Sequence, residues 1–117
     1  MDKIFSNTYN ALKPGGIFGV VEHRADPGTT INEMKKSGYV TEEHAIEIAE
    51  KHGFTLVSKS EINANSRDSK DHPKGVWTLP PSLRLKEQDK QKYLNIGESD
   101  RMTCLLYTSP SPRDAIP

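Results

Sequence analysis

Residues 12–24 read LKPGGIFGVVEHR, and this stretch decides the fold. Its first part is a turn, because Pro14 disfavours a helical residue before it and the Gly15-Gly16 pair allows a tight reversal. Its second part, Ile17–Val21, is a continuous apolar run that ends at charged residues. A short apolar run without alternation is typical of a strand buried on both faces. We therefore predict a strand of a parallel sheet that helices cover on both sides.

The segments next to this strand are predicted to be a helix, a loop and a second helix. Upstream, one face of a helix is formed at 3.6-residue spacing by Ile4, Phe5, Thr8, Ala11 and Leu12. Downstream, residues 25–36 are polar and contain the Pro27-Gly28 turn, so we expect a loop. The second helix is predicted to begin after an N-cap at Thr41 and to end at Gly53, with Phe54 folding back on Ala49.

The remaining segments complete an alternating pattern. Strands are predicted at Thr55–Ile62 and Arg101–Tyr107, and a short polar helix at Lys86–Ile96. Residues 63–85 show no clear period, and a long ordered loop of this kind is often functional. The order helix, strand, helix, strand, insert, strand predicts an α/β fold.

Composition excludes several classes of function. Only 33% of the 117 residues are hydrophobic, and sixteen basic residues balance sixteen acidic ones, so nothing points to nucleic acid or to an anionic membrane. The longest apolar run is too short to span a bilayer. A single cysteine, Cys104, excludes an internal disulfide framework and a Cys-rich zinc site. No metal site is expected, because metal-ligand spacing is absent around the histidines His44, His52 and His72.

A family resemblance rests on several short segments taken in order. They are 12–16 (LKPGG), 38–42 (GYVTE), 50–54 (EKHGF), 59–65 (KSEINAN), 74–81 (KGVWTLPP) and 97–103 (GESDRMT). Together they make residues 1–103 resemble the C-terminal part of a class I S-adenosylmethionine-dependent methyltransferase, within a group of bacterial predicted methyltransferases. The resemblance implies an incomplete Rossmann-like sheet, made of the family's strands five, seven and six with flanking helices.

The resemblance also implies a strand order and a cofactor. The family's seventh strand inserts antiparallel between the fifth and sixth, so Ile17–Glu22 and Thr55–Ile62 should flank Arg101–Tyr107. The far edge of Ile17–Glu22 would then be unpaired and prone to self-association. S-adenosylmethionine is the implied cofactor of the parent enzyme, but the glycine-rich turn that holds it is not in this sequence. We expect this chain to lack most of the cofactor site and to be inactive alone.

Ligands of open α/β sheets bind beyond the carboxyl ends of the strands. Glu22, His23 and Arg24 lie at that end of the first predicted strand, so His23 is the candidate catalytic base for a small-molecule methyl acceptor. Glu22 and Arg24 would bind substrate. The alternative is that these three residues cap the strand and pair with one another on the surface.

The insert supplies three more candidate substrate-binding residues, Asn63, Asn65 and Trp77. They could form a lid over the substrate. Alternatively, Trp77 pins a long loop to the body of the fold.

Two further interpretations concern the ends and the completeness of the chain. Residues 104–114 resemble a translated sequencing adapter, so 104–117 is assigned as a non-native tail after a domain of residues 1–103. Met1 looks like an internal start, so no compartment is inferred from the missing signal peptide. The rival hypothesis is a small, complete, non-enzymatic α/β interaction module. That module would have both sheet faces covered and an ordinary edge at its first strand.

Overall fold

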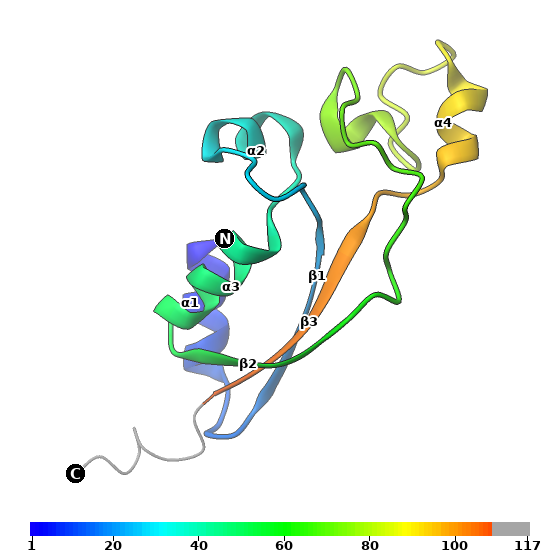
Figure 1. Ribbon diagram of the computed structural model, residues 1–117. Helices are drawn as coiled ribbons and strands as arrows, with labels where there is room; N and C mark the ends of the chain where they lie inside the picture. Colours follow the sequence, from blue (N-terminus) through cyan, green and yellow to red (C-terminus); the bar gives the residue numbers. More distant parts are fainter. Residues whose placement is uncertain (109–117) are drawn as a thin grey trace.

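The computed structural model describes residues 1–108, which form a small α/β protein with four α-helices and a three-stranded sheet (Figure 1). In chain order the elements are α1 (Asp2–Ala11), β1 (Ile17–His23), α2 (Ile31–Ser37), α3 (Glu42–Lys51), β2 (Phe54–Ser60), the 3-10 helix η1 (Gly75–Thr78), α4 (Lys90–Ile96) and β3 (Arg101–Thr108).

The sheet has the predicted strand order. β3 lies in the middle and pairs antiparallel with β1 on one side and with β2 on the other. The β1–β3 register is regular from Ile17 opposite Tyr107 to His23 opposite Arg101. The β2–β3 register shifts by one residue between Leu56 and Ser58. β1 and β2 therefore run in the same direction but do not touch as a pair.

The prediction that Ile17–Val21 belongs to a parallel sheet and is buried on both faces is wrong. No two of the three described strands pair in parallel, so this is not a parallel Rossmann-like sheet. Ile17 is 58% exposed and Val21 is 49% exposed, whereas Phe18 and Val20 between them are half-buried. A continuous apolar run has the same composition whether one face or two are covered, and only the placement of the helices distinguishes the two cases.

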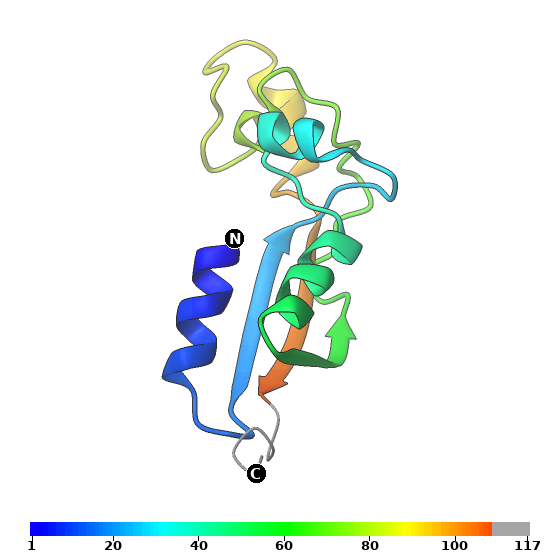
Figure 2. The same cartoon turned by 90° about the vertical axis from the view of Figure 1, so that its left-hand side faces the viewer.

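One face of the sheet carries the core. Figure 2 shows α1 and α3 side by side in front of the strands. Alternate residues of β3 (Met102, Cys104 and Leu106) are buried beneath them. The Phe5 ring of α1 meets Phe54 edge-on at 6.0 Å between ring centroids, and both pack with Ala49 of α3. The predicted contact between Phe54 and the end of α3 is thus confirmed.

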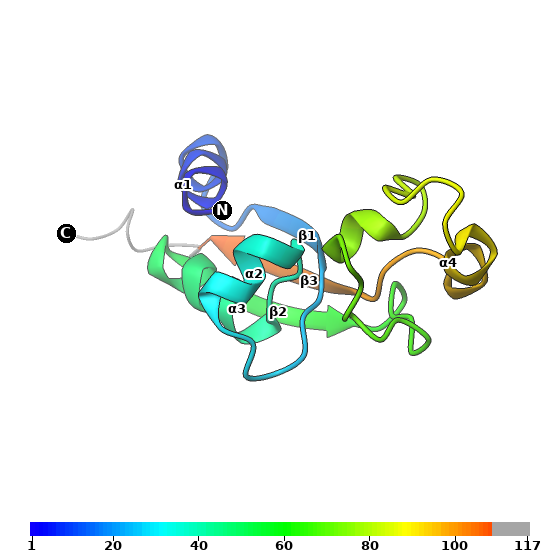
Figure 3. The same cartoon turned by 90° about the horizontal axis from the view of Figure 1, so that it is seen from above.

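The other sheet face is apolar and open. Ile17 and Val21 of β1, Val57 of β2 and Leu105 of β3 are all exposed large hydrophobic residues. The view from above shows α1 next to β1 and α3 next to β2 (Figure 3). Among the described residues, no helix lies against the opposite side of β1 and β3 along the lower part of the sheet in Figure 1.

Two helices follow their capping signals. The Thr41 side chain accepts a hydrogen bond from the His44 amide at 3.1 Å, as predicted for the start of α3. The polar loop expected over residues 25–36 is wrong in its second half, because α2 begins at Ile31. Its N-cap is Thr30, and Glu33 completes a capping box by accepting from the Thr30 amide at 3.0 Å. A Thr-x-x-Glu pattern is a helix start even without an apolar stripe.

The helices at the two ends of the chain differ in detail from their predictions. In α1 only Phe5 is buried, and Ile4, predicted to lie on the same buried face, is 61% exposed. α4 begins at Lys90, which is later than the predicted start at Lys86, and ends before Gly97 as predicted. No helix in the described part of the chain is long and apolar enough to cross a membrane.

Candidate functional site

The residues between β2 and β3 fold over the carboxyl end of β1 (Figure 1). α2 lies beside η1 of this segment, and Gly38 packs so closely on Trp77 that a Cβ there would lie 2.9 Å from the indole ring. We call residues 61–100 the insert. The candidate site lies where the insert meets the end of β1.

Arg24 joins β1 to the insert through its whole guanidinium group. Two hydrogen bonds reach the Asp100 carboxylate, from Nε at 2.9 Å and from Nη2 at 3.0 Å. Two more reach Glu61, at 2.8 and 2.9 Å, and Nη1 also donates to Glu42 at 2.9 Å. These donors are engaged within the protein, which favours the alternative role of Arg24 in capping the strand end.

Asp100 is a second centre of this network. Its carboxylate also lies 2.9 Å from the Lys70 ammonium and accepts from the Asn65 amide at 2.7 Å. Burial by itself raises the pKa of Asp100, but the hydrogen bonds from Arg24, Lys70 and Asn65 outweigh it and hold the pKa well below its ordinary value. Asp100 is therefore an ionised, buried anchor.

Asp68 completes the network from inside the insert. Its carboxylate is fully buried and accepts from the Tyr39 hydroxyl at 2.8 Å and from the amides of Lys70 and Asp100 at 2.9 Å. His72 Nε2 lies 2.8 Å from the same carboxylate. Burial, together with the bond to Asp68, raises the pKa of Tyr39. A buried carboxylate with this many donors holds the loops around it in one arrangement.

His23 and Trp77 are brought together, as the hypothesis of a substrate lid requires. Both line a small open cavity of about 160 Å³, which we call the Trp77 cavity, together with Glu98, Ser99 and the Pro80-Pro81 pair. His23 Nδ1 lies 2.6 Å from Ser99 Oγ, and the imidazole meets the Tyr39 ring edge-on. Within residues 1–108, Nε2 of His23 has no hydrogen-bond partner.

The other three candidates lie outside this cavity. Glu22 accepts a hydrogen bond from the His23 amide at 3.1 Å. Asn63 donates to the Thr103 hydroxyl at 2.7 Å. Asn65 donates to the carbonyl oxygens of Ile96 and Glu98 at 2.8 and 2.7 Å. Both asparagines therefore hold the insert against β3 and α4.

Sequence reasoning missed Ser99, Asp100 and Asp68. For Asp100 a signal was available, since pairing the predicted strands antiparallel with His23 opposite Arg101 places Asp100 opposite Arg24. The register itself was not predictable, because nothing local distinguishes it from a shift by two residues. No comparable signal marks Asp68 or Ser99.

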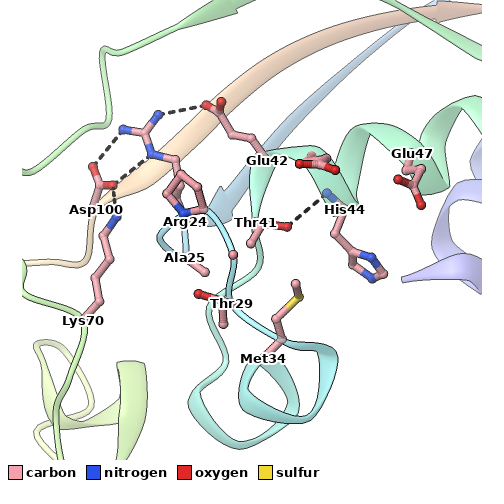
Figure 4. A pocket seen from close by; sticks show the side chains of 13 residues that line it. Arg24, Ala25, Thr29, Met34, Thr41, Glu42, His44, Glu47, Lys70 and Asp100 are labelled. Atoms are coloured by element: carbon pink, nitrogen blue, oxygen red, sulfur yellow. Dashed lines mark hydrogen bonds and ion pairs between the residues drawn. The ribbon is translucent and has the colours of Figure 1, made fainter.

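A larger open pocket of about 670 Å³ lies on the other side of Arg24, between α2 and the start of α3 (Figure 4). Arg24, Lys70 and Asp100 form one wall, and Met34, His44 and Glu47 lie across from them. The cations in this wall are already paired with carboxylates. Among residues 1–108, no group of three or more His, Cys, Asp or Glu side chains is arranged to hold a metal ion.

The residues present do not fit a cradle for S-adenosylmethionine. Such a cradle needs a glycine-rich turn after a strand, where the backbone can approach the cofactor. Here the Gly15-Gly16 pair precedes β1, and a Cβ on Gly16 would lie 2.9 Å from the carbonyl oxygen of Lys13. Gly16 is thus needed for the tight turn before β1, where a side chain would clash, and not for the approach of a cofactor.

No protein-family model, no curated protein and no solved structure matches this chain.

Proposed function

We propose that residues 1–103 are the C-terminal part of a class I S-adenosylmethionine-dependent methyltransferase domain. In this proposal β1, β3 and β2 are strands five, seven and six of an incomplete Rossmann-like sheet. The observation that supports it is the antiparallel insertion of β3 between two strands of the same direction, where residues 101–103 of β3 belong to the proposed domain and residues 104–108 to the proposed tail. This order is the one that the sequence resemblance implies.

The free edge of β1 supports a sheet that continues beyond it. The Arg24 amide donates to Asp100, and the Thr108 amide donates to Gly16 at 3.0 Å, so even-numbered residues of β1 turn their peptide groups toward β3. By alternation, odd-numbered residues face the other way. Val40 pairs with the outward groups of His23 and Ala25 at 2.8 Å. The outward groups of Ile17, Gly19 and Val21 are left for a further strand.

The open apolar face supports the same proposal over a complete interaction module. Such a module requires both faces of its sheet to be covered, whereas Ile17, Val21 and Leu105 are exposed here. An apolar face next to an unpaired strand edge is a surface that proteins usually bury. In the proposed parent enzyme, other parts of the domain cover both.

In this proposal the residues of this chain bind the methyl acceptor rather than the cofactor. His23 would accept the proton of the methyl acceptor at Nε2, while Ser99 holds Nδ1. Trp77, which lines the same cavity, would pack on the acceptor. Substrate roles for Glu22, Arg24, Asn63 and Asn65 have less support, because their polar atoms are engaged internally.

The experiment compares two proteins in a calorimeter. One is the chain as it stands, and the other extends it with the coding sequence upstream of Met1 in the source DNA. We expect S-adenosylmethionine to bind the extended protein only. Binding by the short chain would contradict the assignment of the cofactor site to another part of the domain, and no binding by a folded extended protein would contradict the methyltransferase proposal.

A further inference from the structure

Carboxylate charge is not matched by lysine or arginine in the wall of the Trp77 cavity. Its ionisable lining residues are Glu98 and His23, and neither lysine nor arginine contributes to its wall. Glu98 is mostly exposed, and its nearest cation is Arg101, whose Nη2 lies 3.4 Å from Oε1. That contact is long for an ion pair and leaves Oε2 without a partner in residues 1–108. The cavity therefore presents a carboxylate to whatever enters it.

The Trp77 ring, like Glu98, favours a positively charged ligand. Trp77 is 39% exposed and lines the cavity together with His23. The face of an indole ring carries negative potential and attracts a cation more strongly than any other aromatic side chain does. An anionic ligand would meet Glu98 with no lysine or arginine in the cavity wall, since Arg101, the cation beside Glu98, is not one of its lining residues.

Size and hydrogen bonding narrow the ligand further. A cavity of about 160 Å³ accommodates one ring or a short alkyl chain. The apolar part of such a ligand would contact the Pro80-Pro81 pair and Val76, which share the wall with Trp77. In the tautomer whose Nδ1–H donates to Ser99 Oγ, Nε2 of His23 keeps a lone pair and can accept a hydrogen bond from an N–H group.

We propose that the Trp77 cavity binds a small amine, in which an ammonium or amino group is attached to a hydrocarbon group no larger than one ring. Glu98 and the Trp77 face select the positive charge, and His23 accepts from the N–H group. As the acceptor class of the enzyme this rests on the proposed methyltransferase function, whereas the binding itself does not.

The experiment uses Trp77 as its own reporter, since it is the only tryptophan in the chain. The intact chain is titrated at pH 7 with benzylamine, benzyl alcohol and benzoate, and Trp77 fluorescence is followed. We expect saturable quenching by benzylamine, with an affinity roughly tenfold above that for benzoate. The Glu98→Gln variant should weaken benzylamine binding roughly fivefold and leave benzyl alcohol binding unchanged.

The matched control is Glu87→Gln, which removes an exposed carboxylate outside the cavity. It should not change benzylamine binding, and circular dichroism should show both variants folded. Benzoate binding as tight as benzylamine, an unaltered benzylamine affinity in Glu98→Gln, or no quenching by any of the three probes would each overturn the proposal. None of these titrations involves methyl transfer, so their failure leaves the methyltransferase proposal standing, and failure of S-adenosylmethionine to bind the extended protein leaves amine binding standing.

Discussion

Arg24 and Asp100 lie directly opposite each other, one step beyond the last residue pair of the β1–β3 ladder. The Arg24 amide donates to the Asp100 carbonyl at 2.8 Å, and the two side chains share a two-pronged hydrogen-bonded ion pair. Arg24 and Asp100 are thus joined both by a backbone hydrogen bond that extends the β1–β3 ladder and by their side chains. Because Asp100 also binds Lys70 and the Asn65 amide, this pair couples the sheet to the insert.

Replacing Arg24 should destabilise the protein substantially. Arg24→Met leaves the buried Asp100 carboxylate with Lys70 as its remaining side-chain cation, so we expect a loss of about 3 kcal/mol in the free energy of unfolding. Urea denaturation measures it. Glu61→Gln is the matched control, because Glu61 is an exposed partner of the same arginine and its loss should lower the free energy of unfolding far less. Equal losses in the two variants would refute the role of burial.

Stability should fall in acid, and Asp100 should contribute to the fall. A carboxylate whose pKa is lowered in the folded state adds stability above its unfolded pKa of about 3.9 and loses it as the pH drops toward the folded value. We expect the urea midpoint to decrease from pH 5 to pH 3. Asp100→Asn should have a lower midpoint at pH 7 and a shallower decrease. A variant with the same acid slope as the parent chain would contradict this account.

The Tyr39 hydroxyl should stabilise the insert through Asp68. Tyr39→Phe removes one of the donors to a fully buried carboxylate, so we expect a loss of about 1–3 kcal/mol in unfolding free energy. Tyr107→Phe serves as the control, since within residues 1–108 the Tyr107 hydroxyl has no hydrogen-bond partner and the side chain is only half-buried. Amide hydrogen exchange should show faster opening around residues 68–72 in Tyr39→Phe. Unchanged exchange there would rule out the proposed coupling.

Cys104 should resist thiol reagents in the folded protein. Cys104 lies in β3 and is buried against α3. Burial raises the pKa of its thiol, so little thiolate is present at pH 7. Reaction with a disulfide reagent should be slow until urea is added. In a Cys104→Ala/Leu105→Cys double variant the thiol lies on the open sheet face, and it should react rapidly without urea. Slow reaction of this variant would mean that the face is covered.

The chain on its own should self-associate through β1. The outward peptide groups of Ile17, Gly19 and Val21 form a short unpaired edge, and Ile17 and Val21 add exposed apolar surface. Val21→Lys should shift the chain toward monomer in sedimentation velocity, because a charge on an edge strand opposes pairing. Ile62→Lys, an equally apolar exposed position away from that edge, should leave the association unchanged. A monomeric parent chain would disprove this prediction.

Only part of the candidate site followed from the sequence. Placing His23 at the carboxyl end of a strand needed only the length of the apolar run, and His23 does line a cavity with Trp77. That Ser99 would hold His23, and that Arg24 would be engaged by three carboxylates, depends on residues 18 to 76 positions away along the chain. Contacts at such separations leave no periodic pattern in the sequence. Residues 109–117 of the predicted tail lie outside the described residues.

Local chemistry determines most of the helices and strands, and the strand order expected from the sequence is the observed one. A Thr side chain before a helix satisfies free amides, a glycine after it adopts a positive φ, and a β-rich run extends, whatever lies elsewhere in the chain. Tertiary structure alone decides which faces are covered. Ile17 and Phe18 are both large and apolar, yet Phe18 contacts Phe5 of α1 while Ile17 faces away from it, because successive side chains of a strand point to opposite sides and both core helices pack on one of them.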